Sequence, residues 1–412
     1  MSGSLLSAQG APAARTSGAS LATTLPAPHD SGIEHVVVVM MENRSFDHFL
    51  GWLPGADGKQ AGLRYRDRYG VVHPTHHLTA FDTCGFEDPD HSYEGGRIEL
   101  NGGKCDGWLR AGLNDAASIG YFVKDDLSFY GPAATDWTTC DRYFSAVMAE
   151  TYPNRFYMHA AQTDRLHNST DQCTLPTIWD RLAGKGLSGK YYFSDVAFTL
   201  LWYGKHQDIS FPFSTFLTDC ATGQLPAVSY VDPRFEDEAS GTSNDDHPHA
   251  DIRAGEAFLN QVYDAVRTSP NWEKTVLVIT YDEWGGFFDH VAPTKAPDVS
   301  AKTALRGFRV PTLVISPRAR RNHVAHRVFD HTSVLKMIEW RWGLKPLTPR
   351  DANAHNLASV LDFASPPNLT APTYTVPPFV PTGCSAAGSG AEAAEWGELR
   401  DIGQNLGWGV IS

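Results

Sequence analysis

Four runs of apolar residues stand out along the chain, and each predicts a buried strand. They contain many β-branched side chains and almost no interior polar residue, which is typical of a parallel sheet covered on both faces. The runs are HVVVVMM at 35–41, GKYYFS at 189–194, TVLVITY at 275–281 and VPTLVIS at 310–316.

Two other segments repeat their apolar residues at close to 3.6 positions, which predicts amphipathic helices. The first covers 250–269 and stops at Ser-Pro, because the residue before a proline is disfavoured in a helix. The second covers 330–343, with Asp330 or Thr332 as its N-cap and Gly343 as its terminator. Strands alternating with helices predict an α/β fold, a three-layer sandwich around a mostly parallel sheet.

The remaining segments differ from this core in composition. Residues 53–141 are richer in Gly, His, Asp and Tyr, and they predict long connections or a small insert over the sheet edge. Residues 1–32 and 366–412 are rich in Ala, Ser, Gly and Pro, which predicts a flexible N-terminal tail and a loosely attached C-terminal extension. We therefore expect one large domain over 33–365 with long insertions.

Charge and apolar content exclude two classes of partner. The 412 residues contain 47 Asp and Glu against 34 Lys and Arg, a net charge of −13, and no long basic run is present. Such a chain repels phosphate polymers, so we expect no nucleic-acid binding. No stretch approaches the ~18 consecutive apolar residues of a transmembrane helix, so we expect no transmembrane segment.

The cysteines bear on the compartment. Six lie far apart, without a C-x-x-C pair. Their even number permits three disulfides, although six thiols in a chain of this size can equally be buried singly. We expect a secreted or cell-envelope protein, with the cytoplasm as the alternative.

Polar clusters follow two of the predicted strands directly. Glu42 and Asn43 end the first, and Asp282 and Glu283 end the third. Because ligands bind beyond the carboxyl ends of strands in open α/β sheets, the two clusters together predict a shared cation. Oxygen ligands favour Ca²⁺, Mg²⁺ or Mn²⁺, and nearby histidines leave Zn or Fe open. The alternative is that each cluster only caps a helix with a few exposed charges.

A hydroxyl at a predicted helix start is a candidate phosphate site. Thr151 stands two residues before Pro153, a residue favoured in the first helical turn. Free backbone N–H groups and the positive end of the helix dipole suit a phosphoryl group there. Asn154 and Arg155 offer further phosphate donors. The alternative is that Thr151 merely caps the helix.

The segment SNDDHPHADIRAG at 243–255 concentrates acidic residues and histidines. His247 and Asp251 are four positions apart, which would place them on one face of a helical turn. The alternative is a solvated capping loop. Single histidines are usually surface residues or satisfied core residues, so the other histidines carry no prediction from their pattern alone.

Four motifs in order along the chain resemble the phosphoesterase family of bacteria and plants. They are ENRSFDHFLG, TYPNR, DDHPHAD and YDEWGGFFDHV, and the similarity extends from about Ile33 to about Asp362. That family contains haemolytic and non-haemolytic phospholipases C and a group of acid phosphatases. Its fold is like that of alkaline phosphatase, so the resemblance implies an alkaline-phosphatase-like fold here.

The resemblance also implies roles for individual residues. Thr151 would be the nucleophile and a ligand of one divalent metal ion, with four further ligands: Glu42, Asn43, Asp282 and Glu283. His91 would contact phosphate, and His247 would be a second active-site histidine. Three residues fit the family pattern less securely: Asp251 and His290, as substrate contacts, and His323. Two residues near the substrate depart from the pattern and leave the head group open: Glu150 and Trp284.

We therefore expect a metal-dependent phosphoric ester hydrolase. The first hypothesis is a phospholipase C that converts glycerophospholipids to diacylglycerol and a phosphorylated head group, with transient contact to a membrane surface. The second is an acid phosphatase for small phosphomonoesters. The third is a non-catalytic phosphate- or lipid-binding module, which predicts loss of the threonine or the metal ligands, and both are present.

Overall fold

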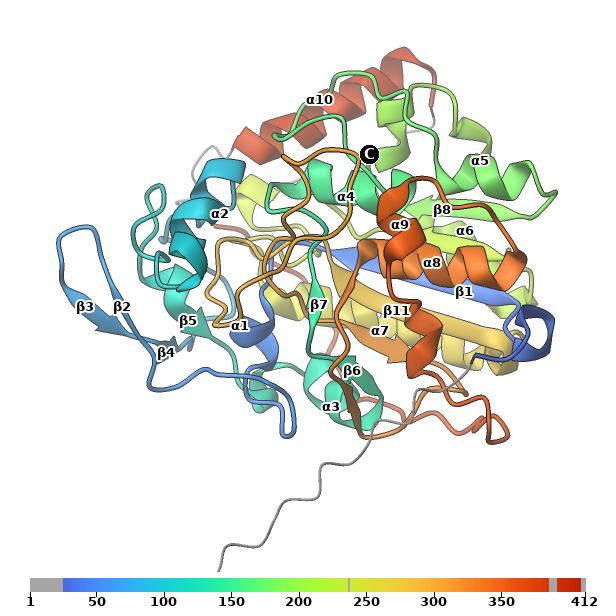
Figure 1. The fold of residues 1–412 in the computed structure, drawn as a ribbon, viewed down its shortest axis with the longest axis horizontal. Helices are drawn as coiled ribbons and strands as arrows, with labels where there is room; N and C mark the ends of the chain where they lie inside the picture. Colours follow the sequence, from blue (N-terminus) through green and yellow to red (C-terminus); the bar gives the residue numbers. More distant parts are fainter. Residues whose placement is uncertain (1–24, 236–237, 385–390, 409–412) are drawn as a thin grey trace, which may run out of the picture.

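The computed structural model describes residues 25–235, 238–384 and 391–408. Its central element is an eight-stranded sheet in the order β13-β6-β12-β11-β1-β10-β8-β9, packed among helices (Figure 1). The strands are β1 His35–Met41, β6 Thr138–Cys140, β8 Gly189–Phe193, β9 Ser210–Pro212, β10 Val228–Val231, β11 Thr275–Tyr281, β12 Leu313–Ile315 and β13 His323–Ala325.

Most neighbouring strands run parallel, which confirms the predicted α/β class. β1 lies between β10 and β11 and is parallel to both, and its seven residues are all buried. Successive side chains of a strand point to opposite faces, so full burial means that both faces are covered. One strand corrects the prediction: β12 is antiparallel to β11 and to β6, and it is shorter than the predicted run at 310–316.

The main helices pack in pairs, α4 against α8 and α6 against α7. Their bounds, with those of the shorter α1, α5 and α9, are α1 Phe46–Leu50, α4 Thr151–Ala160, α5 Ile178–Ala183, α6 Phe213–Thr222, α7 Ile252–Thr268, α8 His331–Trp342 and α9 Pro349–Asn353. Among the described residues, no helix combines the length and the apolar character needed to cross a membrane.

The two predicted helices form where expected. The side chain of Asp330 accepts a hydrogen bond from the backbone N–H of Thr332 and caps α8, which ends at the left-handed Gly343. Asp251 caps α7 in the same way. Because α7 begins only at Ile252, His247 lies in the preceding loop, and the predicted helical face shared by His247 and Asp251 does not form.

Residues 53–141 form mostly connections and short elements, but the last strand in this region belongs to the main sheet. These elements are β2 Arg64–Arg66, β3 Val72–Pro74, β4 His76–His77, α2 Tyr93–Leu100, β5 Gly120–Tyr121 and α3 Tyr130–Asp136. They are followed by β6, which is an inner strand of the main sheet and therefore part of the core.

The C-terminal extension is attached more firmly than predicted. Tyr263 of α7 donates a hydrogen bond to the carbonyl oxygen of Pro372 at 2.7 Å. The final helix, α10 (Ala391–Asn405), buries Trp396 completely against Phe235, with the rings 4.1 Å apart and stacked. At the other end of the chain, most of the predicted N-terminal tail, residues 1–24, lies outside the described residues.

One disulfide forms, between Cys84 and Cys384, which are 300 residues apart in the sequence. The other four cysteines are free and buried, which agrees with the alternative of buried single thiols more than with three disulfides: Cys105, Cys140, Cys173 and Cys220. The bond joins the 53–141 region to the C-terminal extension, two segments that composition alone assigned to the periphery.

We predict that this crosslink contributes measurably to the stability of the whole domain. A disulfide that closes a long loop restricts the unfolded chain, so Cys384→Ser should lower the free energy of unfolding by ~2–5 kcal/mol in chemical denaturation. Cys84→Ser and the double variant should each lose the same amount, because all three remove one bond. This account would be contradicted if the losses of unfolding free energy in the two single variants added up in the double variant. It would also be contradicted if a reductant lowered the stability of the double variant as much as that of the wild type.

Candidate active site

The carboxyl ends of β1 and β11 bring the two predicted acidic clusters together. Met41 pairs with Tyr281 in the parallel register, so Glu42 and Asp282 leave the sheet side by side. The backbone N–H of Asn43 donates a hydrogen bond to Asp282 Oδ1 at 3.1 Å. Both strand ends therefore lie at the same edge of the sheet, as predicted.

The turn after β11 requires glycine at two positions. Gly285 and Gly286 have φ angles of 62° and 67°, in the left-handed region. A Cβ on Gly285 would lie 2.2 Å from the carbonyl oxygen of Asn43, and one on Gly286 would lie 2.6 Å from Cβ of Pro89. The glycines thus let this turn pack against the end of β1 on one side and the loop that carries His91 on the other.

Thr151 is the first residue of α4, and its side chain faces the end of β1. Its Oγ1 lies 3.5 Å from Glu42 Oε2 and 3.4 Å from Asn43 Oδ1, and all three side chains are fully buried. The N-cap position belongs to Glu150, whose side chain makes no capping hydrogen bond. The alternative that Thr151 is only a helix cap therefore finds no support in this geometry.

Arg155, one turn further along α4, is the cation of this cluster. Its guanidinium donates to Glu42 Oε1 at 3.0 Å and to Asp232 Oδ1 at 3.2 Å, and it lies 3.7 Å from Asp282 Oδ2. Burial opposes the charged form, but these carboxylates, Glu42 most strongly, raise the pKa of Arg155. The guanidinium is engaged by protein carboxylates, so the structure assigns it to charge balance and not to the expected substrate contact.

Asn154 also binds the protein itself. Its amide group donates to the carbonyl oxygens of Val147 and Ala149 at 3.0 and 2.7 Å and accepts from the N–H of Val147 at 2.9 Å. These bonds fix the loop that leads into α4. The structure thus places Asn154 in the support of Thr151, whereas the sequence suggested a phosphate donor.

Glu283 contacts both the glycine turn and another predicted metal ligand. Its Oε2 accepts a hydrogen bond from the N–H of Gly285 at 2.8 Å, so this carboxylate helps to shape the turn. Its backbone N–H donates to Asp282 Oδ1 at 2.6 Å, and the other contacts among the predicted ligands join Asn43 to Asp282 and Thr151 to Glu42 and Asn43.

A pair of histidines lies beside this cluster. The rings of His91 and His247 are 6.1 Å apart and perpendicular, and Asp88 Oδ2 lies 3.8 Å from His247 Nε2. The Nδ1 atoms contact backbone carbonyls, at 2.7 Å for His91 and 3.1 Å for His247, and must carry the hydrogen in these bonds because a carbonyl only accepts. Asp245 connects His247 to the sheet edge. Its backbone carbonyl oxygen accepts a hydrogen bond from the N–H of Glu42 at 2.8 Å, and its Oδ1 accepts one from the N–H of His247 at 2.9 Å.

A cavity of about 400 Å³ opens next to the histidines and the start of α4. Acidic residues dominate its wall, and the sole basic group besides His91 is His167. His167 Nδ1 donates a hydrogen bond to Glu150 Oε1 at 2.9 Å, and this bond raises the pKa of His167. The residues that line the cavity are Asp88, Pro89, Asp90, His91, Ser92, Glu150, His167, Asn168 and Glu395.

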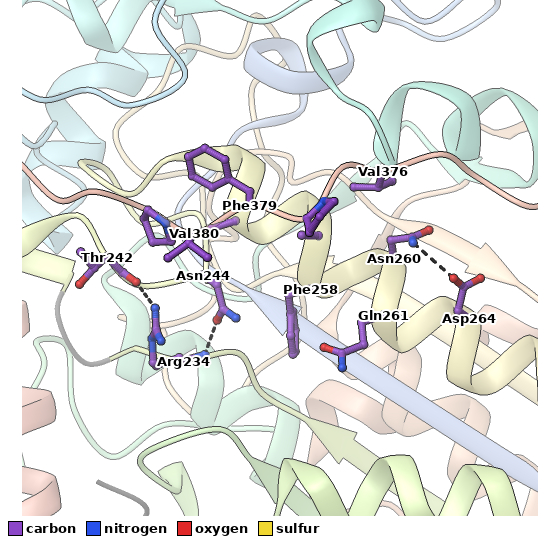
Figure 2. Close-up of a pocket in the computed structure, with 14 residues that line it drawn as sticks. Arg234, Thr242, Asn244, Phe258, Asn260, Gln261, Asp264, Val376, Phe379 and Val380 are labelled. Atoms are coloured by element: carbon purple, nitrogen blue, oxygen red, sulfur yellow. Dashed lines mark hydrogen bonds between the residues drawn. The ribbon is translucent and has the colours of Figure 1, made fainter.

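A larger cavity of about 750 Å³ lies between α7 and residues 376–381 (Figure 2). Phe258, Asn260 and Gln261 line it from α7, and Val376, Phe379 and Val380 line it from the other segment. None of the predicted site residues lines this cavity, so its size does not make it the candidate active site.

Two of the less secure candidates lie apart from the Thr151 cluster. Asp251 accepts from the N–H of Arg253 at 3.0 Å and pairs with its guanidinium, so it serves the start of α7. His323 begins β13, the edge strand of the sheet, and is separated from β1 by three strands. The predictions that these residues belong to the site are not supported by their positions.

His290 belongs to a second buried charge network. Its Nδ1 contacts Asp47 Oδ2 at 2.5 Å, and its Nε2 lies 3.2 Å from Asp57. Arg309 pairs with both Asp47 and Asp289, at 3.0 and 2.9 Å. The expected contact between His290 and substrate is thus replaced by a network that fixes α1 to the segment after β11.

Three residues next to the site were not predicted from the sequence. Asp232 follows β10 as Glu42 follows β1, but the strand VSYV is too short to stand out. Asp88 precedes His91 by three positions. His331 donates from Nε2 to the carbonyl oxygen of Asp282 at 2.6 Å, and burial lowers its pKa to about 4, so it is neutral at pH 7. As the first residue of α8, it carried no signal beyond being a histidine.

The donor atoms around Thr151 fit a divalent cation. They are carboxylate, amide and hydroxyl oxygens, which hard cations prefer. The carboxylates of Glu42, Asp232 and Asp282 face the single guanidinium of Arg155, so buried negative charge is in excess there and a further cation would balance it. In the described chain, the groups of three acidic or histidine ligand atoms within 4.8 Å of one another are Asp88–His91–His247 and Asp47–Asp289–His290.

Comparisons with known proteins agree with these features. The model of the Phosphoesterase family matches residues 33–345. The chain is 32% identical over 441 residues to phospholipase C B of Mycobacterium tuberculosis, covering 85% of this chain and 82% of that protein. It is 31% identical over 390 residues to non-specific phospholipase C1 of Arabidopsis thaliana, covering 82% and 73%.

A weaker likeness exists to solved structures. The lipoteichoic acid synthase LtaP from Listeria monocytogenes aligns with a TM-score of 0.44 and 8% identity, covering 92% of each chain. A protein in the alkaline phosphatase superfamily from Vibrio parahaemolyticus aligns with a TM-score of 0.43 and 10% identity, covering 81% of this chain and 71% of that one.

The family model and the phospholipase C relatives show that the protein is a phosphoric ester hydrolase. The family match covers most of the chain, and the chain belongs to the phosphoesterase family.

We predict that Arg155 acts mainly on stability. Arg155→Leu leaves three carboxylates without their counter-ion, which should cost ~3–5 kcal/mol of unfolding free energy in chemical denaturation. A matched control is Arg253→Gln, because that arginine is 45% exposed and pairs with a helix-cap aspartate, so its loss should cost less than ~1 kcal/mol. An Arg155→Leu variant as stable as the wild type but inactive would restore the substrate-binding role.

Proposed function

We propose that this enzyme is a phospholipase C that hydrolyses glycerophospholipids to diacylglycerol and a phosphorylated head group. The observation that carries the proposal is the position of the Thr151 hydroxyl, at the start of α4 and within 3.5 Å of the Glu42 and Asn43 side chains. The relatives named phospholipase C, which match over more than four-fifths of this chain, support the choice of substrate class.

The acidic cavity favours a diester over a monoester. A phosphomonoester carries close to two negative charges at neutral pH and a phosphodiester only one, so the acidic wall opposes the monoester more strongly. Zwitterionic phospholipids also bring a cationic group that Glu150 and Asp90 would attract. An acid phosphatase for small monoesters is the second candidate, supported by the same nucleophile and donor set.

A divalent metal ion would be held by Glu42, Asn43, Asp282, Glu283 and the hydroxyl of Thr151. Oxygen ligands favour Ca²⁺, Mg²⁺ or Mn²⁺, and the neighbouring histidines leave Zn or Fe as alternatives. When bound, the ion would neutralise the phosphate and lower the pKa of the Thr151 hydroxyl.

The chain's own residues supply the remaining chemistry. The Thr151 hydroxyl releases its proton to solvent, its Oγ1 attacks phosphorus, the bond to the diacylglycerol oxygen breaks, and a phosphothreonine that still carries the head group forms. One of the two histidines, His91 or His247, gives a proton to the departing oxygen from Nε2, because its Nδ1–H is directed to a carbonyl. Water then hydrolyses the phosphothreonine, and the phosphorylated head group leaves.

We also propose that the protein acts outside the cytoplasm, in the cell envelope or after secretion. The Cys84–Cys384 disulfide supports this location, because disulfides persist in oxidising compartments.

The proposed substrate class predicts a clear preference between two assays. The enzyme should release diacylglycerol from phosphatidylcholine, measured by lipid chromatography, with a higher kcat/KM than it shows on p-nitrophenyl phosphate. A metal chelator should abolish both activities, and adding back Ca²⁺, Mg²⁺ or Mn²⁺ in turn should identify the ion. If only the monoester is hydrolysed, the protein is a phosphatase and not a phospholipase C. If neither substrate is hydrolysed with any of these metals, the protein is a binding module.

The nucleophile has its own test. Thr151→Ala should keep the fold but reduce turnover by several orders of magnitude, whereas Thr151→Ser should retain activity because it keeps the hydroxyl. Acid quenching during turnover of a substrate labelled in the phosphate should trap label on Thr151. If the alanine variant instead turns over normally and loses only the ~0.5–2 kcal/mol of a helix cap, the threonine is structural and water is the attacking group.

A further inference from the structure

The hairpin formed by β2 and β3 stands away from the body of the protein (Figure 1). It projects beyond α2 on the side toward which β1 runs into α1, so it lies on the same side of the sheet as the carboxyl ends that carry the candidate active site (Figure 1). The mechanism proposed above uses none of its residues.

The two faces of the hairpin differ in what they contact. Side chains alternate between faces along a strand, so Tyr65 points opposite to Arg64 and Arg66. Tyr65 is buried in a cluster of apolar side chains that includes Trp108 and Phe288. Arg66 pairs directly with Val72 across the hairpin, and both are exposed. One face therefore anchors the hairpin to the protein, and the other presents arginine beside an aliphatic residue to solvent.

The tip of the hairpin is preorganised and apolar. Asp67 accepts hydrogen bonds from the N–H groups of Tyr69 and Val71 at 2.9 and 2.8 Å, and its other oxygen lies 2.8 Å from His73 Nε2. These bonds hold the turn while its apolar side chains remain in solvent, with Tyr69 86% exposed and Val71 54% exposed. No described segment of the chain covers them.

Charge on the hairpin is opposite to that of the whole protein. Residues 64–74 carry Arg64, Arg66 and Arg68 against Asp67, a net charge of +2 with His73 neutral, whereas the whole chain carries −13. Arginine and aromatic side chains together suit the interface of a membrane, where the cation meets lipid phosphates and the ring lies among the head groups.

Exposed apolar side chains also gather in this part of the chain. Six of the ten large hydrophobic residues that are exposed in the described structure belong to residues 53–141: Tyr69, Val71, Val72, Phe86, Ile98 and Leu113. Arg68 donates to the carbonyl oxygen of Gly112 at 2.6 Å, which places Leu113 close to the hairpin.

We propose that the hairpin of residues 64–74 docks the enzyme onto phospholipid surfaces that contain anionic lipid. The arginines bind lipid phosphates, and Tyr69, Val71 and Val72 enter the interfacial layer. The choice of a lipid surface rests on the proposed phospholipase activity, but docking itself needs no turnover.

Binding to vesicles tests the docking directly. The assay is sedimentation with vesicles of phosphatidylcholine alone or mixed with phosphatidylglycerol, in a Thr151→Ala background so that the lipid stays intact. Replacing Arg64, Arg66 and Arg68 by Gln should weaken binding to the mixed vesicles about 100-fold, at ~5-fold per arginine. Replacing Tyr69, Val71 and Val72 by Ser should weaken binding to both kinds of vesicle.

A control variant makes changes of both kinds elsewhere on the surface. Arg327→Gln, Val299→Ser and Leu369→Ser together remove one exposed arginine and two half-exposed apolar side chains, and this variant should bind like its parent. In an otherwise wild-type chain, the hairpin variants should keep their kcat/KM on p-nitrophenyl phosphate or a monomeric short-chain phospholipid and lose it on vesicles. A loss on soluble substrates as well would mean that the hairpin supports the fold or the site.

Vesicle binding by both hairpin variants at the level of the parent would overturn the proposal. If the same variants also change the sedimentation velocity of the protein, the hairpin is instead a contact between copies of this chain. Vesicle binding is measured without turnover, so it tests docking separately from the phospholipase activity. If the wild type binds vesicles but does not hydrolyse their lipid, the docking proposal holds and the phospholipase proposal fails.

Discussion

The Arg155 guanidinium, buried among carboxylates, is the interaction on which the rest of the site depends. Three neighbouring strands, β11, β1 and β10, end in Asp282, Glu42 and Asp232, and Arg155 contacts all three side chains. Buried carboxylates at this density repel one another, and a cation fixed on α4 offsets much of that repulsion. The same contacts fix the first turn of α4 and with it the direction of the Thr151 hydroxyl.

Sheet order and the glycine turn build the site around this charge cluster. Because β1 lies between β10 and β11, three acidic strand ends become neighbours although they are far apart in the sequence. Gly285 and Gly286 then bring the loop of His91 against the end of β11. The structure thus brings together the Thr151 hydroxyl, which we propose as the nucleophile, a pair of histidines and a set of oxygen donors that fits a cation. Such positioned charge is a major source of catalysis in phosphoryl transfer.

Segments at the periphery of the fold also contribute to the candidate active site. The C-terminal helix α10 buries Trp396 on Phe235, whose ring in turn lies under Arg155 at 4.6 Å. Glu395 of that helix lines the acidic cavity beside His91. The extension that composition marks as loose therefore contributes a wall of the candidate active site. Composition could not show this, because a few aromatic residues among many small ones decide where the segment packs.

The sequence by itself determined the fold class, both long helices with their caps, and the presence of Glu42, Asn43, Thr151 and Asp282 at element ends, because these depend on local patterns. Only the tertiary structure decided that Arg155 pairs with three carboxylates of the protein. It also decided that the fourth predicted strand is antiparallel and that a single disulfide forms across 300 residues. Such outcomes depend on which distant groups meet in the folded chain, and neither spacing nor composition encodes that directly.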